Sequence, residues 1–268
     1  MKKRALIVGI SEYTPLLPNL FSAAFEARKW RDLLLQVYGF ARRNVVMLVD
    51  KAATRSAITD RLMWLLGDSR PGDQLVFIFC GHGVRTPRPG SVGDCVDLQD
   101  EGLVPYPAGA ADPRDVALFD DDLTALYCSI GIAPGARPTF IFDCCYSAGL
   151  DFAKPERTRK ALVLPVDLAH CGRSPENFFR LALQGARSGV CTDPLVVAST
   201  GEYDEASEVP PATQKRSLFS SRAIETLRRN PVLTYQDLVS SVALDMEFLR
   251  QTPSLTGDPF RIQQQFFM

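Results

Sequence analysis

Two short stretches of the sequence join an apolar run to a reactive side chain near glycine. In "FIFCGHGV", His82 lies between two glycines, and in "FIFDCCYSAG" the run ends at Cys144 and Cys145. A cysteine nucleophile needs its thiolate, and a nearby imidazole can take the thiol proton. Flanking glycines let the backbone turn sharply and leave room for a substrate chain. The two stretches therefore predict the halves of one Cys/His site that forms an acyl-thioester.

Each of these residues also has a purely structural interpretation. A buried cysteine most often packs as a small hydrophobe, and a lone histidine is more often a satisfied polar residue than a catalyst. The chain has only two histidines, however, and one of them stands here. The joint position of His82 and Cys145 at matching strand ends favours catalysis. Backbone N–H groups of Gly83 and Cys145 are then the expected oxyanion hole.

Alternating apolar and helical patterns predict the framework that positions these residues. Strands are expected at 5–9, 44–50, 74–80, 137–145 and 193–200, with an edge strand at 261–268, and helices at 22–40, 54–68, 120–130, 217–229 and 234–249. Fully apolar strands between amphipathic helices predict a parallel sheet covered on both faces. Active residues of such sheets gather beyond the C-terminal strand edge. His82 and Cys145 would meet there if the third and fourth strands are neighbours.

Two segments do not show this alternation of strand and helix patterns and are expected to be long loops. Residues 84–119 are rich in Pro, Gly and Asp, and residues 152–190 hold seven Lys/Arg against three acids. Loops of this length are usually functional or mobile. Because there is no internal repeat or convincing linker, a single domain over 1–268 is expected.

Charge balance, the length of apolar runs and the cysteines argue against several classes of partner, location and metal site for this sequence. Thirty Lys/Arg balance 31 Asp/Glu, so no overall field favours nucleic acid or an anionic membrane. Apolar runs are too short for a membrane span, and the basic start suits a buried strand better than a signal peptide, which predicts a cytoplasmic protein. The seven cysteines should be free thiols, and no Cys/His cluster has zinc spacing.

The stretches "FCGHGV" and "DCCYSAG" resemble the two catalytic signatures of the caspase-like cysteine peptidases, specifically the metacaspases and their bacterial relatives, the orthocaspases. Cys80 replaces a typical Ser, and Ala148 stands where a Gly is usual. The segments "ALIVGISEY", "EGLVPY", "DDDLTAL", "EASE" and "RQTPSLTGDP" extend the likeness over nearly the whole chain. The resemblance implies a caspase-like three-layer α/β sandwich with a mainly parallel six-stranded sheet.

The resemblance also implies roles for individual residues. Cys145, two residues after Asp143, corresponds to the nucleophile, and His82 to the base that later protonates the leaving amine. Asp143 corresponds to the pocket for the residue before the cut, together with Cys80 and Glu26. A carboxylate there favours a long cation, so cleavage after Arg, then Lys, is expected. Glu26 stands where the family has Asp, and a solvated helix face is its alternative.

Calcium is the one metal that the resemblance suggests, and no organic cofactor is expected. Residues 94–122 hold nine acids against one Arg. Asp100, Asp120 and Asp121 resemble the carboxylates of calcium-dependent metacaspases, and Asp151 lies near the fourth. Hard oxygen ligands suit Ca²⁺. The alternative is an acid cluster at a helix N-terminus beside a solvated loop.

The basic segment 152–190 is a candidate for activating cleavage by the enzyme itself or by a partner peptidase. The candidate sites are Arg157, Arg159, Lys160, Arg173 and Arg187. An uncut mobile loop is the alternative.

The sequence thus predicts an Arg/Lys-specific cysteine endopeptidase with protein substrates, an activating peptidase or regulator as a partner, and a monomeric state. Two rivals stay open: a catalytically silent caspase-like module that binds a partner protein, and a non-peptidase cysteine hydrolase on an open α/β sheet.

Overall fold

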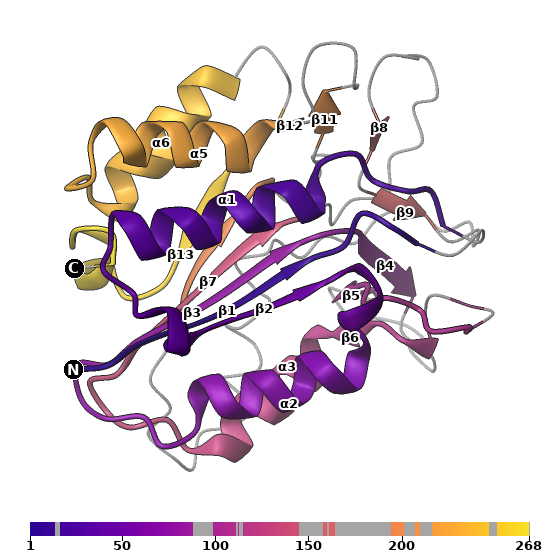
Figure 1. Ribbon diagram of the computed structural model, residues 1–268, viewed down its shortest axis with the longest axis horizontal. Helices are drawn as coiled ribbons and strands as arrows, with labels where there is room; N and C mark the ends of the chain where they lie inside the picture. Colours follow the sequence, from indigo (N-terminus) through magenta and orange to yellow (C-terminus); the bar gives the residue numbers. More distant parts are fainter. Residues whose placement is uncertain are drawn as a thin grey trace, which may run out of the picture.

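The computed structural model describes residues 1–13, 17–87, 99–110, 112, 115–144, 158–159, 161–163, 194–200, 207–209, 216–246 and 251–267. Its central feature is a six-stranded sheet in the order β13-β10-β7-β3-β1-β2 (Figure 1). The strands are β1 (Lys3–Gly9), β2 (Val45–Val49), β3 (Gln74–Cys80), β7 (Arg137–Asp143), β10 (Leu195–Ala198) and β13 (Ser254–Thr256). All neighbouring pairs are parallel except β10–β13. The predicted, mainly parallel sheet is confirmed.

Helices cover both faces of this sheet, which explains why its central strands are apolar over most of their length. One face carries α1 (Ala23–Gln36), α5 (Leu218–Arg229) and α6 (Tyr235–Met246), and the other carries α2 (Arg55–Leu66) and α3 (Asp120–Ile130) (Figure 1). All seven residues of β3 are buried, and six of the seven in both β1 and β7. Such strands have no solvated face, so polar alternation is absent. The result is the predicted three-layer α/β sandwich.

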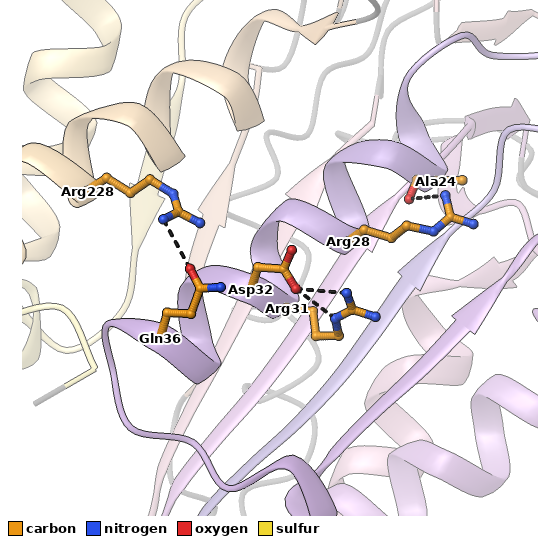
Figure 2. Close-up of polar contacts among 6 residues, drawn as sticks. All are labelled: Ala24, Arg28, Arg31, Asp32, Gln36 and Arg228. Atoms are coloured by element: carbon orange, nitrogen blue, oxygen red, sulfur yellow. Dashed lines mark hydrogen bonds and ion pairs between the residues drawn. The ribbon is translucent and has the colours of Figure 1, made fainter.

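Helix boundaries follow local chemistry. Thr54 Oγ1 accepts a hydrogen bond from Ala57 N at 3.3 Å and caps α2. The exposed face of α1 carries an Arg31–Asp32 ion pair at 2.8 Å, and Arg228 of α5 donates to Gln36 at 3.4 Å (Figure 2). These polar groups mark the solvent side of α1. The opposite side packs on the sheet through residues such as Trp30.

Both segments expected to be loops contain strands, so that part of the prediction is wrong. A four-stranded sheet joins β4 (Gly83–Pro87), β5 (Gln99–Leu103), β6 (Leu118–Phe119) and β9 (Ala161–Val163), and a three-stranded sheet joins β8 (Thr158–Arg159), β11 (Ser207–Val209) and β12 (Arg216–Ser217). These strands are short, and they pair across long stretches of chain. Local composition does not reveal such pairing.

The predicted edge strand at 261–268 is also wrong. The edge strand beside β10 is β13, and residues 259–262 form the short helix α7 (Pro259–Ile262), which Asp258 caps by accepting from Phe260 N at 2.7 Å. Phe266 and Phe267 are both fully buried. Consecutive residues of a strand point to opposite faces, so an edge strand with one covered face could not bury both.

The remaining short helical turns are η1 (Arg42–Asn44) and η2 (Asp50–Ala52). Within the described residues, no helix combines the length and apolarity that crossing a bilayer requires.

Candidate active site

His82 lies in the two-residue link between β3 and β4, at the C-terminal edge of the central sheet. Its side chain is fully buried. Gly81 must be glycine here, because a Cβ would lie 2.9 Å from both the Phe79 ring and the Tyr13 hydroxyl. The link between β3 and β4 is therefore a tight turn that places the His82 imidazole at the edge of the sheet, as the sequence predicts.

The imidazole is held by the loop that follows β1. His82 Nε2 lies 2.8 Å from the carbonyl oxygen of Pro18, and the Tyr13 ring packs against the imidazole with 4.7 Å between centroids. A carbonyl oxygen only accepts, so Nε2 carries the proton of this contact and the lone pair of the neutral ring is on Nδ1. Sequence reasoning missed Pro18 and Tyr13. The one available signal was their position after a strand that ends at the same sheet edge.

The cysteine-bearing strand is the direct neighbour of the histidine-bearing strand. β3 pairs with β7 in parallel, with Cys80 opposite Asp143. The adjacency that the sequence left conditional is therefore present. Cys144 is fully buried, which fits its expected packing role. Cys145 follows it directly and lies outside the described residues.

The candidate pocket residues Cys80 and Asp143 face the α1/α5 layer. Gly9, Cys80 and Asp143 are aligned across β1, β3 and β7, and a Cβ on Gly9 would meet the Ala27 Cβ of α1 at 2.4 Å. Aligned residues share a face of the sheet. Consistently, Asp143 accepts a hydrogen bond from Ser217 at 2.5 Å, and Cys80 Sγ lies 4.0 Å from Ser220 Oγ of α5.

Two acidic side chains are buried within this layer. Asp143 is fully buried, and Glu26 on α1 is only 2% exposed. The solvated-helix-face interpretation of Glu26 is therefore wrong, because the exposed face of α1 is the opposite one (Figure 2). Ser217, which the sequence analysis did not select, is the hydroxyl that contacts Asp143. Buried carboxylates are costly unless hydrogen-bonded or paired with a cation.

Gly83, the expected oxyanion donor, opens β4, and the neighbouring ladder fixes the direction of its N–H. Val104 N donates to His82 O at 3.0 Å, so residues 82 and 104 are the hydrogen-bonded pair of the β4–β5 ladder. Donor directions alternate along an antiparallel ladder. The N–H of Gly83 therefore points away from β5, toward the side on which β9 pairs with β4.

The backbone brings three of the acidic candidates together. Asp100 lies in β5, and Asp120 and Asp121 begin α3 directly after β6. Because Gly102 pairs with Phe119 in antiparallel register, Asp100 falls beside residues 120 and 121. Asp151 lies outside the described residues.

Of the candidate cleavage sites, Arg159 lies in β8, which pairs with β11. The other four, Arg157, Lys160, Arg173 and Arg187, lie outside the described residues.

Known proteins resemble this chain in sequence and in fold. The family profile described as "Metacaspase, peptidase C14 domain" matches residues 3–152. Metacaspase-1 of Schizosaccharomyces pombe is 30% identical over 187 residues, covering 65% of this chain and 42% of that protein. Metacaspase-1A of Aspergillus niger is 27% identical over 275 residues, covering 90% of this chain and 66% of that protein. The chain thus spans less than two thirds of the length of either relative.

Among solved structures, the crystal structure of protein GSU0716 from Geobacter sulfurreducens matches with a TM-score of 0.72 and 20% identity, covering 100% of this chain and 99% of that one. At this identity the likeness concerns the fold alone. It supports the caspase-like arrangement of sheet and helices.

Proposed function

Since the chain belongs to the metacaspase family of peptidase C14 domains, we propose that it is a cysteine endopeptidase that cleaves proteins after Arg or Lys, with Cys145 as nucleophile and His82 as base. The observation that carries this proposal is the buried His82 imidazole, whose Nε2 contacts Pro18 O at 2.8 Å. His82 follows directly after β3, which is the neighbour of β7, the strand that leads into Cys145.

The reaction follows from the protonation state of His82. Nδ1 takes the proton of the Cys145 thiol, and the thiolate attacks the scissile carbonyl carbon. The resulting oxyanion is stabilised by the backbone N–H groups of Gly83 and Cys145. The imidazolium then protonates the leaving amine, which leaves an acyl-thioester. Water, deprotonated by the same nitrogen, releases the acid and restores the thiol.

Selectivity for Arg or Lys is proposed from the acids of the α1/α5 layer. Asp143 and Glu26 are both buried, and Asp143 keeps a hydrogen bond from Ser217. A substrate guanidinium that enters this layer would be attracted by both carboxylates, and its planar fork suits carboxylates better than an ammonium does. An acidic residue before the cut would add a third carboxylate and should be rejected.

Calcium regulation is proposed on the carboxylates at the β5–α3 junction. Asp100, Asp120 and Asp121 lie together along the backbone and offer the hard oxygen donors that Ca²⁺ prefers. Asp151 is the proposed fourth ligand. Bound calcium would neutralise these acids and fix the junction of β5 with α3.

Activation by cleavage of segment 152–190 is proposed from its Lys and Arg residues, which match the acidic pocket. Among them, Arg159 requires that the β8–β11 pair open first, because a bound substrate is extended and a paired strand is not free to enter a cleft. We therefore expect Arg157, Lys160, Arg173 or Arg187 to be cut before Arg159.

The test is hydrolysis of Arg-, Lys- and Asp-ended fluorogenic peptides by the wild type and Cys145→Ala, each with calcium or with a chelator. We expect Arg cleavage above Lys, none after Asp, and complete loss in Cys145→Ala. Gel analysis of the same samples follows the chain itself. Activity that survives in Cys145→Ala contradicts the nucleophile, and cutting of pure Cys145→Ala contradicts self-cleavage. A wild type that stays inactive even after limited trypsin treatment favours the silent module.

A further inference from the structure

The Tyr13 hydroxyl is inserted into the β-ladder at the histidine. It accepts from His82 N at 3.0 Å and donates to Val104 O at 3.1 Å, while Val104 N donates directly to His82 O at 3.0 Å. A hydrogen-bonded antiparallel pair normally exchanges two direct bonds. Here one of the two runs through a side-chain hydroxyl. The backbone of His82 is therefore placed by Tyr13 as much as by Val104.

The Tyr13 ring contacts the catalytic side chain as well. Its centroid lies 4.7 Å from that of the His82 imidazole, at an interplanar angle of 57°, and Tyr13 is only 8% exposed. One residue thus touches both the amide and the ring of His82. Together with the Pro18 carbonyl on Nε2, it restricts rotation of the imidazole.

The segment that carries Tyr13 is itself fixed from a neighbouring strand end. Asp50, directly after β2, accepts from Ser11 N at 2.7 Å and from Glu12 N at 3.0 Å through the same oxygen. Asp50 adopts φ +48°, a left-handed conformation that Asp tolerates better than most residues. Asn19 Oδ1 accepts from Tyr13 N at 2.7 Å and closes the loop from its other end.

We infer that Tyr13, anchored through Asp50, is a positioning residue that holds the His82 imidazole in its reactive orientation. The inference rests on the proposed function, since it concerns the orientation of the proposed base. Neither residue contacts the scissile bond in this scheme. Tyr13 fixes the amide and the ring plane of His82, Pro18 fixes the proton on Nε2, and Asp50 holds the segment that presents both. A base displaced by about 1 Å can lose on the order of a hundredfold in rate.

The first test is Tyr13→Phe, which keeps the ring and removes both hydroxyl bonds. We expect kcat on an Arg-ended peptide to fall about 10- to 100-fold, with KM changed less than about twofold. The ratio of the Cys145 alkylation rate by iodoacetamide at pH 6.5 to the rate at pH 9 should be lower in Tyr13→Phe than in the wild type, because a displaced imidazole stabilises less thiolate. Tyr106→Phe, two residues beyond Val104, is the matched control and should keep wild-type values.

The second test uses Asp50 variants that separate the loss of the hydrogen-bond acceptor from a change in backbone strain. It also keeps the inference testable if Tyr13→Phe does not fold. Glycine adopts φ +48° freely, so Asp50→Gly removes only the acceptor. We expect kcat to fall about 3- to 10-fold in Asp50→Gly and to recover to within about twofold of wild type in Asp50→Asn, whose side-chain oxygen still accepts.

The outcomes distinguish this inference from the proposed function. An active wild type together with fully active Tyr13→Phe and Asp50→Gly overturns the positioning role and leaves the peptidase intact. A wild type with neither peptidase activity nor an alkylation-sensitive Cys145 overturns the proposed function, and the inference falls with it.

Discussion

At the scale of single residues, the proposed selectivity rests on two buried acids, which add negative charge on one side of the central sheet. Asp143 at the end of β7 and Glu26 on α1 lie on the same side of the central sheet, and each is at most 2% exposed. Glu26 replaces the shorter Asp that is typical of the family, so its carboxylate reaches one methylene further into this layer. The pair is thus a strong candidate for the group that selects Arg.

Neutralising either acid tests this assignment. Asp143→Asn and Glu26→Gln should each lower kcat/KM on an Arg-ended peptide about 10- to 100-fold, because a charge-assisted hydrogen bond is worth roughly 1.5–3 kcal/mol. Asparagine still accepts from Ser217, so folding should be affected little. Alkylation of Cys145 should keep its wild-type rate, since the nucleophile is untouched. The measurement is steady-state hydrolysis beside iodoacetamide alkylation.

Glu225→Gln provides the matched control for these variants. Glu225 lies on α5 but points to solvent, where it faces Arg222 at 3.9 Å. It should retain wild-type kcat/KM. If Asp143→Asn and Glu26→Gln cleave after Arg as well as this control does, the acidic pocket is elsewhere.

At the scale of elements, the junction of β5, β6 and α3 is where calcium would act. Asp122 in the first turn of α3 already has a structural role, because its carboxylate accepts from Phe119 N at 3.2 Å and pairs with Arg55 at 3.0 Å. Arg55 also donates to Ala117 O and so ties α2 to this junction. Asp100, Asp120 and Asp121 are the acids that remain as proposed ligands.

Calcium at about a hundred times its dissociation constant should stabilise the folded chain by about 2.7 kcal/mol. For a chain of this size that corresponds to a rise of roughly 5–10 °C in the unfolding temperature. We expect the rise to disappear in the double variant Asp100→Asn, Asp121→Asn. Calorimetry with calcium, with magnesium and with a chelator makes the measurement independent of activity.

Asp122→Asn is the comparison for this double variant. It should lower the unfolding temperature without metal, because it weakens the helix cap and the Arg55 pair, while it keeps the calcium-dependent rise. Equal unfolding temperatures with calcium and with chelator in the wild type would argue against the site.

At the scale of the whole molecule, the C-terminal residues close the end of the sheet opposite the active site. Phe266 and Phe267 pack with Tyr38 and Tyr235, with ring centroids 4.6–6.1 Å apart, and with each other at 4.2 Å. Tyr38 donates to Pro231 O at 3.3 Å, and the Tyr235 hydroxyl lies 3.2 Å from Thr139 Oγ1. Burial raises the pKa of both tyrosines above the ordinary value. This cluster therefore makes global stability sensitive to alkaline pH.

The direction in which the free energy of unfolding changes with pH depends on whether the folded or the unfolded chain releases the tyrosine protons first. Above about pH 10 the unfolded chain ionises these tyrosines while the folded chain keeps them neutral, so the unfolded state binds fewer protons. The stability they contribute is complete below about pH 10 and is lost as pH rises further. The free energy of unfolding should fall by up to about 1.4 kcal/mol per pH unit for each tyrosine. Urea unfolding at pH 8, 10 and 11 measures this change in the free energy of unfolding.

Tyr38→Phe isolates one of the two contributions. It should cost about 1 kcal/mol at pH 8, through the lost bond to Pro231 O, and should lose less stability than the wild type between pH 10 and 11. Identical pH slopes for the two proteins would mean that Tyr38 ionises equally in both states.

The sequence by itself determined the central layers and the two strand ends that carry chemistry. Continuous apolar runs such as 74–80 have no polar face, which requires helices on both sides, and the ends of parallel strands meet at one edge. The glycine-flanked His82 and the cysteines after β7 were therefore identifiable from residue type and position. These features depend on periodicity and on contacts within a few residues.

Tertiary structure decided what holds and surrounds that histidine. Tyr13, Pro18 and Asp50 come from two other strand ends, 32 to 69 residues away in sequence from His82, and Ser217 reaches Asp143 across 74 residues. The two small sheets and the edge strand β13 also depend on distant partners. A hydrogen bond between remote segments leaves no local pattern, because each partner alone looks like an ordinary loop residue. Only the order of strands in the folded sheet brings these residues together.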